Sequence, residues 1–180
     1  MKRTLCMLLA LIMLFALPGC EGSENTVNGD NPLALYKDGE PLVWVGMARQ
    51  DVYQALSITP PENPQNLESF AGLDFTFRDE VILNVTTENP DYSDWRGVRP
   101  GMKKEEIAKR YTDVEAKITE FEEYGKKQWA ADIILDQERK IVPQKGEVPM
   151  NFFHIALIPD KSDLSMIGKI SISNTEEFMK

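Results

Sequence analysis

The sequence has 180 residues, of which 42% are hydrophobic, and a formal net charge of −9. This length suits one domain of ordinary size or two small domains built alike. The excess of acidic side chains argues against binding to nucleic acid and against electrostatic adhesion to anionic lipid head groups. A protein partner is therefore expected to offer a basic face.

The amino terminus has the three-part layout of an export signal. Lys2 and Arg3 precede an uncharged apolar run from Leu5 to Leu17, and Pro18-Gly19-Cys20 follows. This run is well below the roughly 20 residues that a helix needs to span a bilayer. We expect residues 1–19 to be a cleaved signal peptide, whose loss takes Lys2 and Arg3 away and moves the net charge from −9 to −11.

The segment Leu17-Pro18-Gly19-Cys20 resembles the lipobox of bacterial lipoproteins. The resemblance implies that Cys20 receives a diacylglyceryl thioether, becomes the first residue, and anchors the chain to the cell membrane or outer membrane through acyl chains such as palmitate. The folded part then lies outside the cytoplasm. The alternative is an ordinary signal peptide cut elsewhere, with Cys20 as a free thiol. Either way Cys6 is lost, so no intramolecular disulfide is expected.

A tether and a hairpin are expected next. Residues 20–32 are polar, rich in Asn and Gly, and lack an apolar period, which is typical of a flexible linker. The apolar segments 33–36 and 42–45 then flank a turn that contains Asp38-Gly39, a strong signal for a β-hairpin.

Two segments share a pattern at a spacing of 55 positions. Gly46-Met47 and Gly101-Met102 are each followed by polar residues, an acid and a β-branched aliphatic residue. The pattern predicts two helix starts with Ala48 and Lys103 at the N-cap, where neither side chain can supply a capping oxygen. Pro60 and Pro61 are expected to end the first helix early.

Several segments downstream alternate between apolar and polar residues, as strands do. The pattern predicts strands at 73–77 and 81–85 around a turn at Asp79-Glu80, at 129–135, and at 153–157 and 166–173 around a loop at 159–163. Residues 112–127 fit two structures, because Ile118 and Phe121 suit a helical face whereas Gly125 suits a hairpin.

Helices and strands are thus segregated along the chain, without βαβ alternation. We expect an α+β fold with antiparallel sheets, built as two tandem helix-plus-sheet units at 33–95 and 96–180.

The stretch Arg96-Gly97-Val98-Arg99-Pro100-Gly101-Met102-Lys103-Lys104-Glu105-Glu106-Ile107 resembles the helix-start motif of small bacterial lipoproteins, including the SmpA/OmlA outer-membrane assembly lipoproteins, and of the β-lactamase inhibitor protein fold. The resemblance covers Gly46 to Leu56 and Arg96 to Tyr111. It implies helices packed on a small antiparallel sheet, in two tandem units.

Enzyme and metal chemistry find little support in the residues. His154 is the single histidine and lies in an alternating apolar strand, where we expect a structural imidazole. No serine lies in a nucleophile elbow, and no phosphate-loop or dinucleotide fingerprint occurs. Two loops offer oxygen ligands to calcium, at Asp160, Ser162 and Asp163 and at Asp91, Ser93 and Asp94, but turns are the better interpretation. We expect no enzyme, metal or cofactor.

Trp95, Arg96 and Arg99 are the candidate binding residues, because Trp and Arg are enriched at interface hot spots. The alternative is that Trp95 covers the helix end from within the core while the two arginines bridge to acids. The leading hypothesis is a non-enzymatic, lipid-anchored binding module that engages an envelope protein or cell-wall component. Alternatives are an inhibitor of an envelope or secreted enzyme, such as a β-lactamase, peptidase or lysozyme, and a hydrolase with an unrecognised acidic site.

Overall fold

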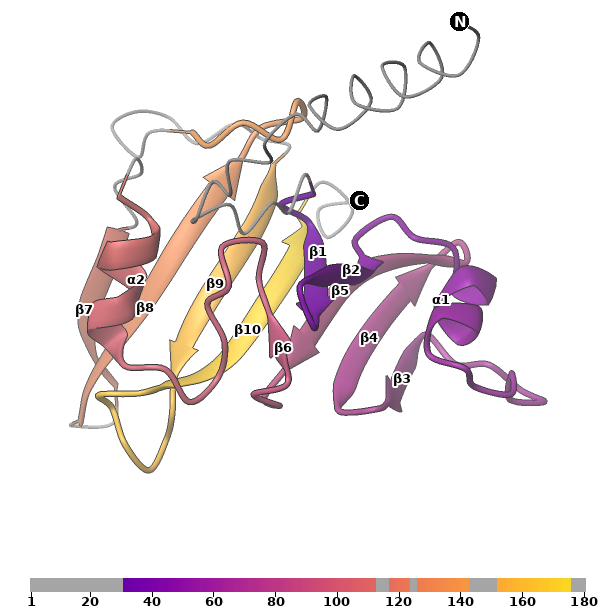
Figure 1. The fold of residues 1–180 in the computed structure, drawn as a ribbon, viewed down its shortest axis with the longest axis horizontal. Coiled ribbons are helices and arrows are strands. Elements are labelled where there is room, and N and C mark those ends of the chain that lie inside the picture. The colour runs from indigo at the N-terminus through magenta and orange to yellow at the C-terminus, as the bar shows by residue number, and fades with distance from the viewer. Residues whose placement is uncertain (1–30, 113–116, 124–125, 143–151, 176–180) are drawn as a thin grey trace, which may run out of the picture.

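The computed structural model describes residues 31–112, 117–123, 126–142 and 152–175. Nearly half of these residues form two antiparallel sheets, and two short helices lie beside them (Figure 1). The smaller sheet has the strand order β2-β1-β6, with β1 at Ala34–Lys37, β2 at Glu40–Trp44 and β6 at Tyr92–Ser93. Asp38 and Gly39 both take positive φ in the β1–β2 turn, which confirms the predicted hairpin.

The larger sheet has seven strands in the order β3-β4-β5-β10-β9-β8-β7. The strands lie at Leu67–Phe70 (β3), Leu73–Arg78 (β4), Val81–Thr87 (β5), Lys117–Glu123 (β7), Lys126–Leu135 (β8), Phe153–Pro159 (β9) and Ile167–Asn174 (β10). The predicted strands correspond to β4, β5, β8, β9 and β10. Strands β5 and β10, far apart in sequence, pair antiparallel at the centre and join the two predicted units into one sheet.

The predicted α+β class with two tandem helix-plus-sheet units is wrong. Strands make up 47% of the structure and helices 11%. Helix α1 spans only Arg49–Ala55 and helix α2 only Lys104–Arg110. The first ends because Ser57 takes the left-handed backbone at φ 55° ahead of Pro60, and the second ends where Tyr111 leaves helical ψ.

Residues 112–127, whose sequence fits either a helix or a hairpin, contribute to the β7–β8 hairpin within their described part. Strand β7 pairs along β8 from Lys117↔Asp132 to Glu123↔Lys126. Without this pairing, one edge of β8 would present its backbone N–H and C=O groups unpaired. Tertiary pairing therefore decided between the two structures that the sequence allowed.

The predicted helix starts are confirmed, and their caps come from elsewhere in the chain. Ala48 and Lys103 are the N-cap residues, and neither makes a side-chain capping hydrogen bond. Instead, Arg49 N donates to the Glu80 carbonyl and Lys104 N to the Ser165 carbonyl, each at 2.8 Å. A remote turn thus satisfies one of the backbone donors that every helix start exposes.

One core lies between the large sheet, the helices and the small sheet. The inward face of the large sheet supplies Phe75, Ile133 and Ile170, while Val52 of α1 and Ile107 of α2 pack onto the same cluster. Figure 1 shows α2 and the small sheet in front of the large sheet, and α1 at the right, beside β3 and β4. The opposite face carries partly exposed polar residues among those described, including Thr76, Asn84, Ser171, His154 and Asp132.

Candidate functional site

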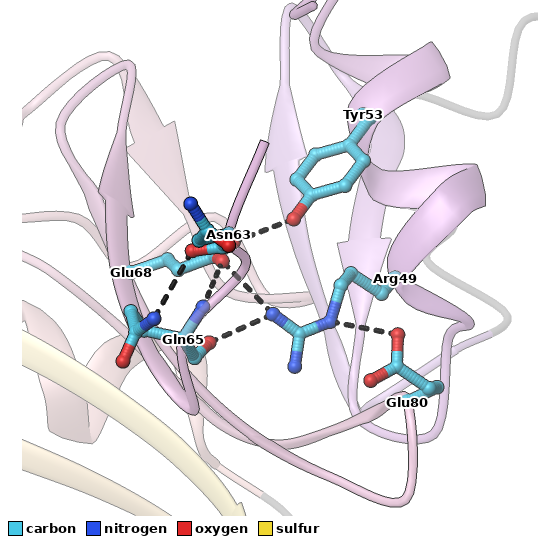
Figure 2. Close-up of polar contacts among 6 residues, drawn as sticks. All are labelled: Arg49, Tyr53, Asn63, Gln65, Glu68 and Glu80. Carbon is cyan, nitrogen blue, oxygen red and sulfur yellow. Dashed lines mark hydrogen bonds and ion pairs between the residues drawn. The ribbon is translucent and has the colours of Figure 1, made fainter. Parts of the chain in front are cut away.

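Arg49, the first residue of α1, is the centre of a buried polar cluster (Figure 2). Its guanidinium lies over the Phe77 ring at 4.1 Å and is 3% exposed. Nη1 donates to Glu68 Oε1 at 2.9 Å and to the Gln65 carbonyl at 2.7 Å. Nε forms an ion pair with Glu80 Oε2 at 3.0 Å. The buried cation therefore joins α1, the approach to β3 and the β4–β5 turn.

Glu68 on β3 uses both carboxylate oxygens within this cluster. Oε1 accepts hydrogen bonds from Arg49 and from the Gln65 backbone N–H, and Oε2 accepts one from the Tyr53 hydroxyl at 2.8 Å. Burial, followed by the hydrogen bond to Glu68, raises the pKa of Tyr53, so the phenol stays protonated as a donor. Both the N–H and the C=O of Gln65 are thus held by buried charged groups.

The cluster fixes the end of an exposed loop. Residues 59–66 are all exposed and connect α1 to β3. They include Pro60, Pro61 and Pro64, whose rings set their own φ and restrict the preceding residues to extended conformations. Leu67, where the loop enters β3, is 73% exposed. The outcome is a stiff, partly apolar protrusion beside the sheet edge.

Lys104 occupies the matching position in the second helix and makes weaker versions of the same contacts. Its ammonium is 2.8 Å from Glu120 Oε1 on β7 and 5.5 Å from the centre of the Trp129 ring on β8. Glu120 is 70% exposed, however, so water screens this pair, whereas Arg49 and Glu68 are both buried.

Arg49, Tyr53 and Glu68 are not among the binding residues predicted from the sequence, although the repeat carried a signal for them. A cation at the first position of a helix is unfavourable next to the positive end of the helix dipole. Arg49 and Lys104 both stand there, 55 positions apart. An acidic partner for each was therefore to be expected from the sequence.

The predicted binding residues lie between β6 and α2. Trp95 is partly buried against the core and meets Tyr111 edge-on, with ring centres 6.4 Å apart. The Arg96 guanidinium lies over both rings, at 4.3 and 4.9 Å, and its Nη1 donates to the Arg110 carbonyl. Arg99 is exposed. The structure thus brings Trp95 and Arg96 together, and their role in binding stays a prediction.

Asp94 lies beneath this group and is fully buried. Oδ1 accepts the backbone N–H groups of Arg96 and Val98, each at 2.9 Å, and Oδ2 accepts the Tyr111 hydroxyl at 2.5 Å. Desolvation outweighs these hydrogen bonds and the charge of Arg110, and raises the pKa of Asp94 from 3.8 to about 6. The carboxylate therefore ties the turn before α2 to the end of that helix.

The single histidine lies on the partly exposed face of the large sheet. His154 Nε2 is 2.7 Å from Asp132 Oδ1 on the neighbouring strand, and its ring meets Phe152 edge-on. The imidazole is 29% exposed. This arrangement orients the ring across β8 and β9, as a structural histidine would be oriented.

The two acidic loops use their oxygens in turns. Asp160 Oδ1 accepts hydrogen bonds from the Ser162 hydroxyl and from the backbone N–H groups of Ser162 and Asp163, and these bonds lower the Asp160 pKa. In the other loop, both carboxylate oxygens of Asp94 accept hydrogen bonds from the protein. Within the described ranges, His, Cys, Asp and Glu side chains do not gather in a group of three suited to a metal ion.

Cys20 and the predicted tether up to residue 30 lie outside the described residues. Neither helix in the described part of the chain has the length and apolar character needed to cross a membrane. Lipid attachment therefore stays a prediction.

Comparisons of the chain with protein-family models, with curated proteins and with solved structures found no match.

Proposed function

We propose that this chain is a lipid-anchored, non-enzymatic binding module of the bacterial cell envelope, and that the loop at 59–66 contacts its partner, an envelope protein or a cell-wall component. The observation that carries the proposal is the support of this loop. Arg49 and Glu68 are almost fully buried and direct their hydrogen bonds at Gln65, at the base of an exposed segment.

Such support matters for recognition. A loop that is ordered before binding loses less conformational entropy on association, so more of its contact energy appears as affinity. Pro60, Pro61 and Leu67 offer exposed apolar surface of fixed shape, and Glu62 adds a negative charge for the basic partner face expected from the overall acidity.

Site-specific photo-crosslinking in envelope extracts tests this proposal. A photoreactive residue in place of Glu62 is expected to yield a discrete adduct that excess unlabelled protein removes, whereas the same residue in place of exposed Lys161 yields none. The chain in which a Gly-Ser segment of equal length replaces residues 59–64 should keep its circular dichroism spectrum and, added unlabelled in excess, should fail to remove the adduct. Identical adducts from both positions, or removal of the adduct by the loop-replaced chain, would contradict the proposal.

The same experiment also tests the binding residues that were predicted from the sequence. Arg99→Ala removes an exposed side chain without touching the core, and Trp95→Ala removes a partly buried one. A weaker adduct from Arg99→Ala at unchanged thermal stability would extend the contact surface to this region. An unchanged adduct would exclude Arg99 from it.

An inhibitor of an envelope or secreted enzyme is the second candidate, because a stiff convex loop suits insertion into an active-site cleft. Titration of the protein against a β-lactamase, a peptidase and a lysozyme separates this candidate from the first. Inhibition that the loop replacement abolishes supports it, and the absence of inhibition at micromolar protein rules it out for these enzymes.

The proposed anchor is tested through Cys20. Metabolic labelling with a palmitate analogue and membrane fractionation are expected to show a labelled, membrane-bound chain that Cys20→Ser releases unlabelled. A Cys20→Ser chain that stays labelled would contradict lipid attachment at this residue.

A further inference from the structure

A cavity of about 330 Å³ opens at one end of the large sheet. The cavity is lined by residues at the end of β2, in the β4–β5 turn, shortly after β8, at the start of β9 and at the end of β10. Its apolar lining includes Val81, which is 38% exposed, and half-buried Phe153, together with the buried Leu33, Val45 and Ile82. This volume is at the small end of the range for ligand pockets, which are mostly apolar with a few placed polar groups.

Two guanidinium groups line the same cavity, from Arg78 at the end of β4 and Arg139 in the β8–β9 connection. Asp79 is the single acid among the described lining residues, so basic side chains outnumber acidic ones in this part of the lining, although the protein as a whole is acidic. The backbone around Arg139 is fixed by a turn in which its N–H donates to the Asp136 carbonyl at 2.9 Å. The turn therefore fixes the backbone position from which the Arg139 side chain extends.

We propose that this cavity binds an amphiphilic anion, in which a carboxylate or phosphate pairs with the arginines and a short acyl chain lies on the apolar wall. Guanidinium forms charge-assisted hydrogen bonds with either anion. The volume corresponds to about ten non-hydrogen atoms, if each occupies roughly the 30 Å³ that a water molecule takes in the liquid. Octanoate, with its carboxylate and seven further carbons, has this size and is the probe that we choose.

The proposal concerns a region separate from the loop at 59–66 and does not depend on the proposed partner. If the protein is anchored through Cys20, the membrane is close enough to the cavity to supply a lipid as the ligand. Residues 20–32 span at most about 45 Å when fully extended. The ligand chemistry itself rests on the cavity alone.

The test uses the chain from residue 20 onward, with Cys20→Ser to prevent lipidation. The described contacts all lie within residues 31–175, so this chain retains every one of them. Binding of octanoate, octan-1-ol and acetate is measured by NMR chemical-shift titration. Octanoate is expected to shift resonances of the cavity lining saturably, whereas octanol, which lacks the charge, and acetate, which lacks the chain, bind at least about tenfold more weakly. Equal affinity for either control ligand would overturn the proposal.

Variants test the two arginines. Arg139→Asn suits the positive φ at this turn and is expected to weaken octanoate binding about tenfold while leaving octanol binding unchanged. Arg78→Gln should also weaken octanoate binding, and exposed Lys161→Gln is the control with the same loss of charge. Octanoate affinity that survives both cavity variants, or that falls equally in the control, would overturn the proposal.

Vesicle flotation then distinguishes a membrane lipid from a free acid as the source. If the lipid head group is the ligand, the chain floats with phosphatidylglycerol vesicles and not with phosphatidylcholine vesicles, and Arg139→Asn prevents this. If the ligand is a free acid, octanoate binds and neither vesicle recruits the chain. Absence of octanoate binding together with absence of flotation refutes the site.

Discussion

Asp94→Asn provides a direct test of how burial acts on the turn before α2. The pKa of Asp94 is raised from 3.8 to about 6 in the folded protein, and its unfolded value is expected near 3.8. Between about pH 4 and pH 6 the folded state therefore binds more protons than the unfolded state. The stabilising contribution is fully present below pH 3.8 and is lost as the pH rises through about 6.

The magnitude follows from the size of the pKa difference. A difference of about 2 pKa units corresponds to about 3 kcal/mol of unfolding free energy between pH 4 and pH 7. Asparagine resembles the protonated acid, because its carbonyl accepts from the Arg96 and Val98 N–H groups while its amide faces the Tyr111 hydroxyl. The variant cannot lose a proton, so its pH dependence lacks this contribution.

Urea denaturation followed by tryptophan fluorescence at several values between pH 4 and pH 7 measures the difference. We expect Asp94→Asn to gain about 3 kcal/mol relative to the wild type over this range. Other carboxylates titrate in both proteins and cancel in the comparison. Parallel curves for the two proteins, or an Asp94 pKa near 4 by carboxyl NMR, would refute the conclusion that desolvation outweighs the three hydrogen bonds.

Three further predictions concern stability. Arg49→Met leaves the Glu68 carboxylate buried without its cation and is expected to lower the free energy of unfolding by about 3–5 kcal/mol, measured by urea denaturation. If the double variant with Glu68→Gln loses the sum of the two single effects, the pair is not coupled. Lys104→Met should cost less than about 1 kcal/mol by the same measurement, because its partner carboxylate is 70% exposed, and a loss as large as that at Arg49 would contradict this difference. Gly168→Ala would place a Cβ 2.6 Å from the Asp160 Cα, so we expect a loss of about 1–3 kcal/mol in thermal unfolding; unchanged stability would mean that the loop shifts freely.

The candidate site shows why periodicity misses some functional residues. In β3, Leu67 is 73% exposed whereas Glu68 is 9% exposed, which inverts the usual apolar-inward alternation. Glu68 is buried because Arg49 and Tyr53 occupy that side of the strand. A pattern based on hydrophobicity assigns both residues to the wrong face, and only the partner side chains reveal the correct one.

The segregation of predicted helices and strands along the chain led to the wrong fold class for a related reason. The repeated Gly-Met segments do begin helices, and both glycines take the positive φ that their turns require. The length of each helix, however, depends on the residues after its first turn and on the strands that they enter. Each helix ends after seven residues, and the strands dominate.

The sequence by itself determined the local features: the β1–β2 hairpin turn, the alternation in β4, β5, β8, β9 and β10, and the two helix starts without capping side chains. These features arise from interactions between residues that are close in the sequence, and such interactions produce a short-range pattern of residue types. Only the tertiary structure decided the strand order, the β7–β8 hairpin and the carbonyl groups that cap the helices. The strand order and the capping carbonyl groups depend on contacts between distant segments, as between Asn84 and Ser171 across 87 positions, and such contacts leave no local pattern in the sequence. Residues 112–127, in contrast, fit two local patterns, and the sequence alone did not choose between them.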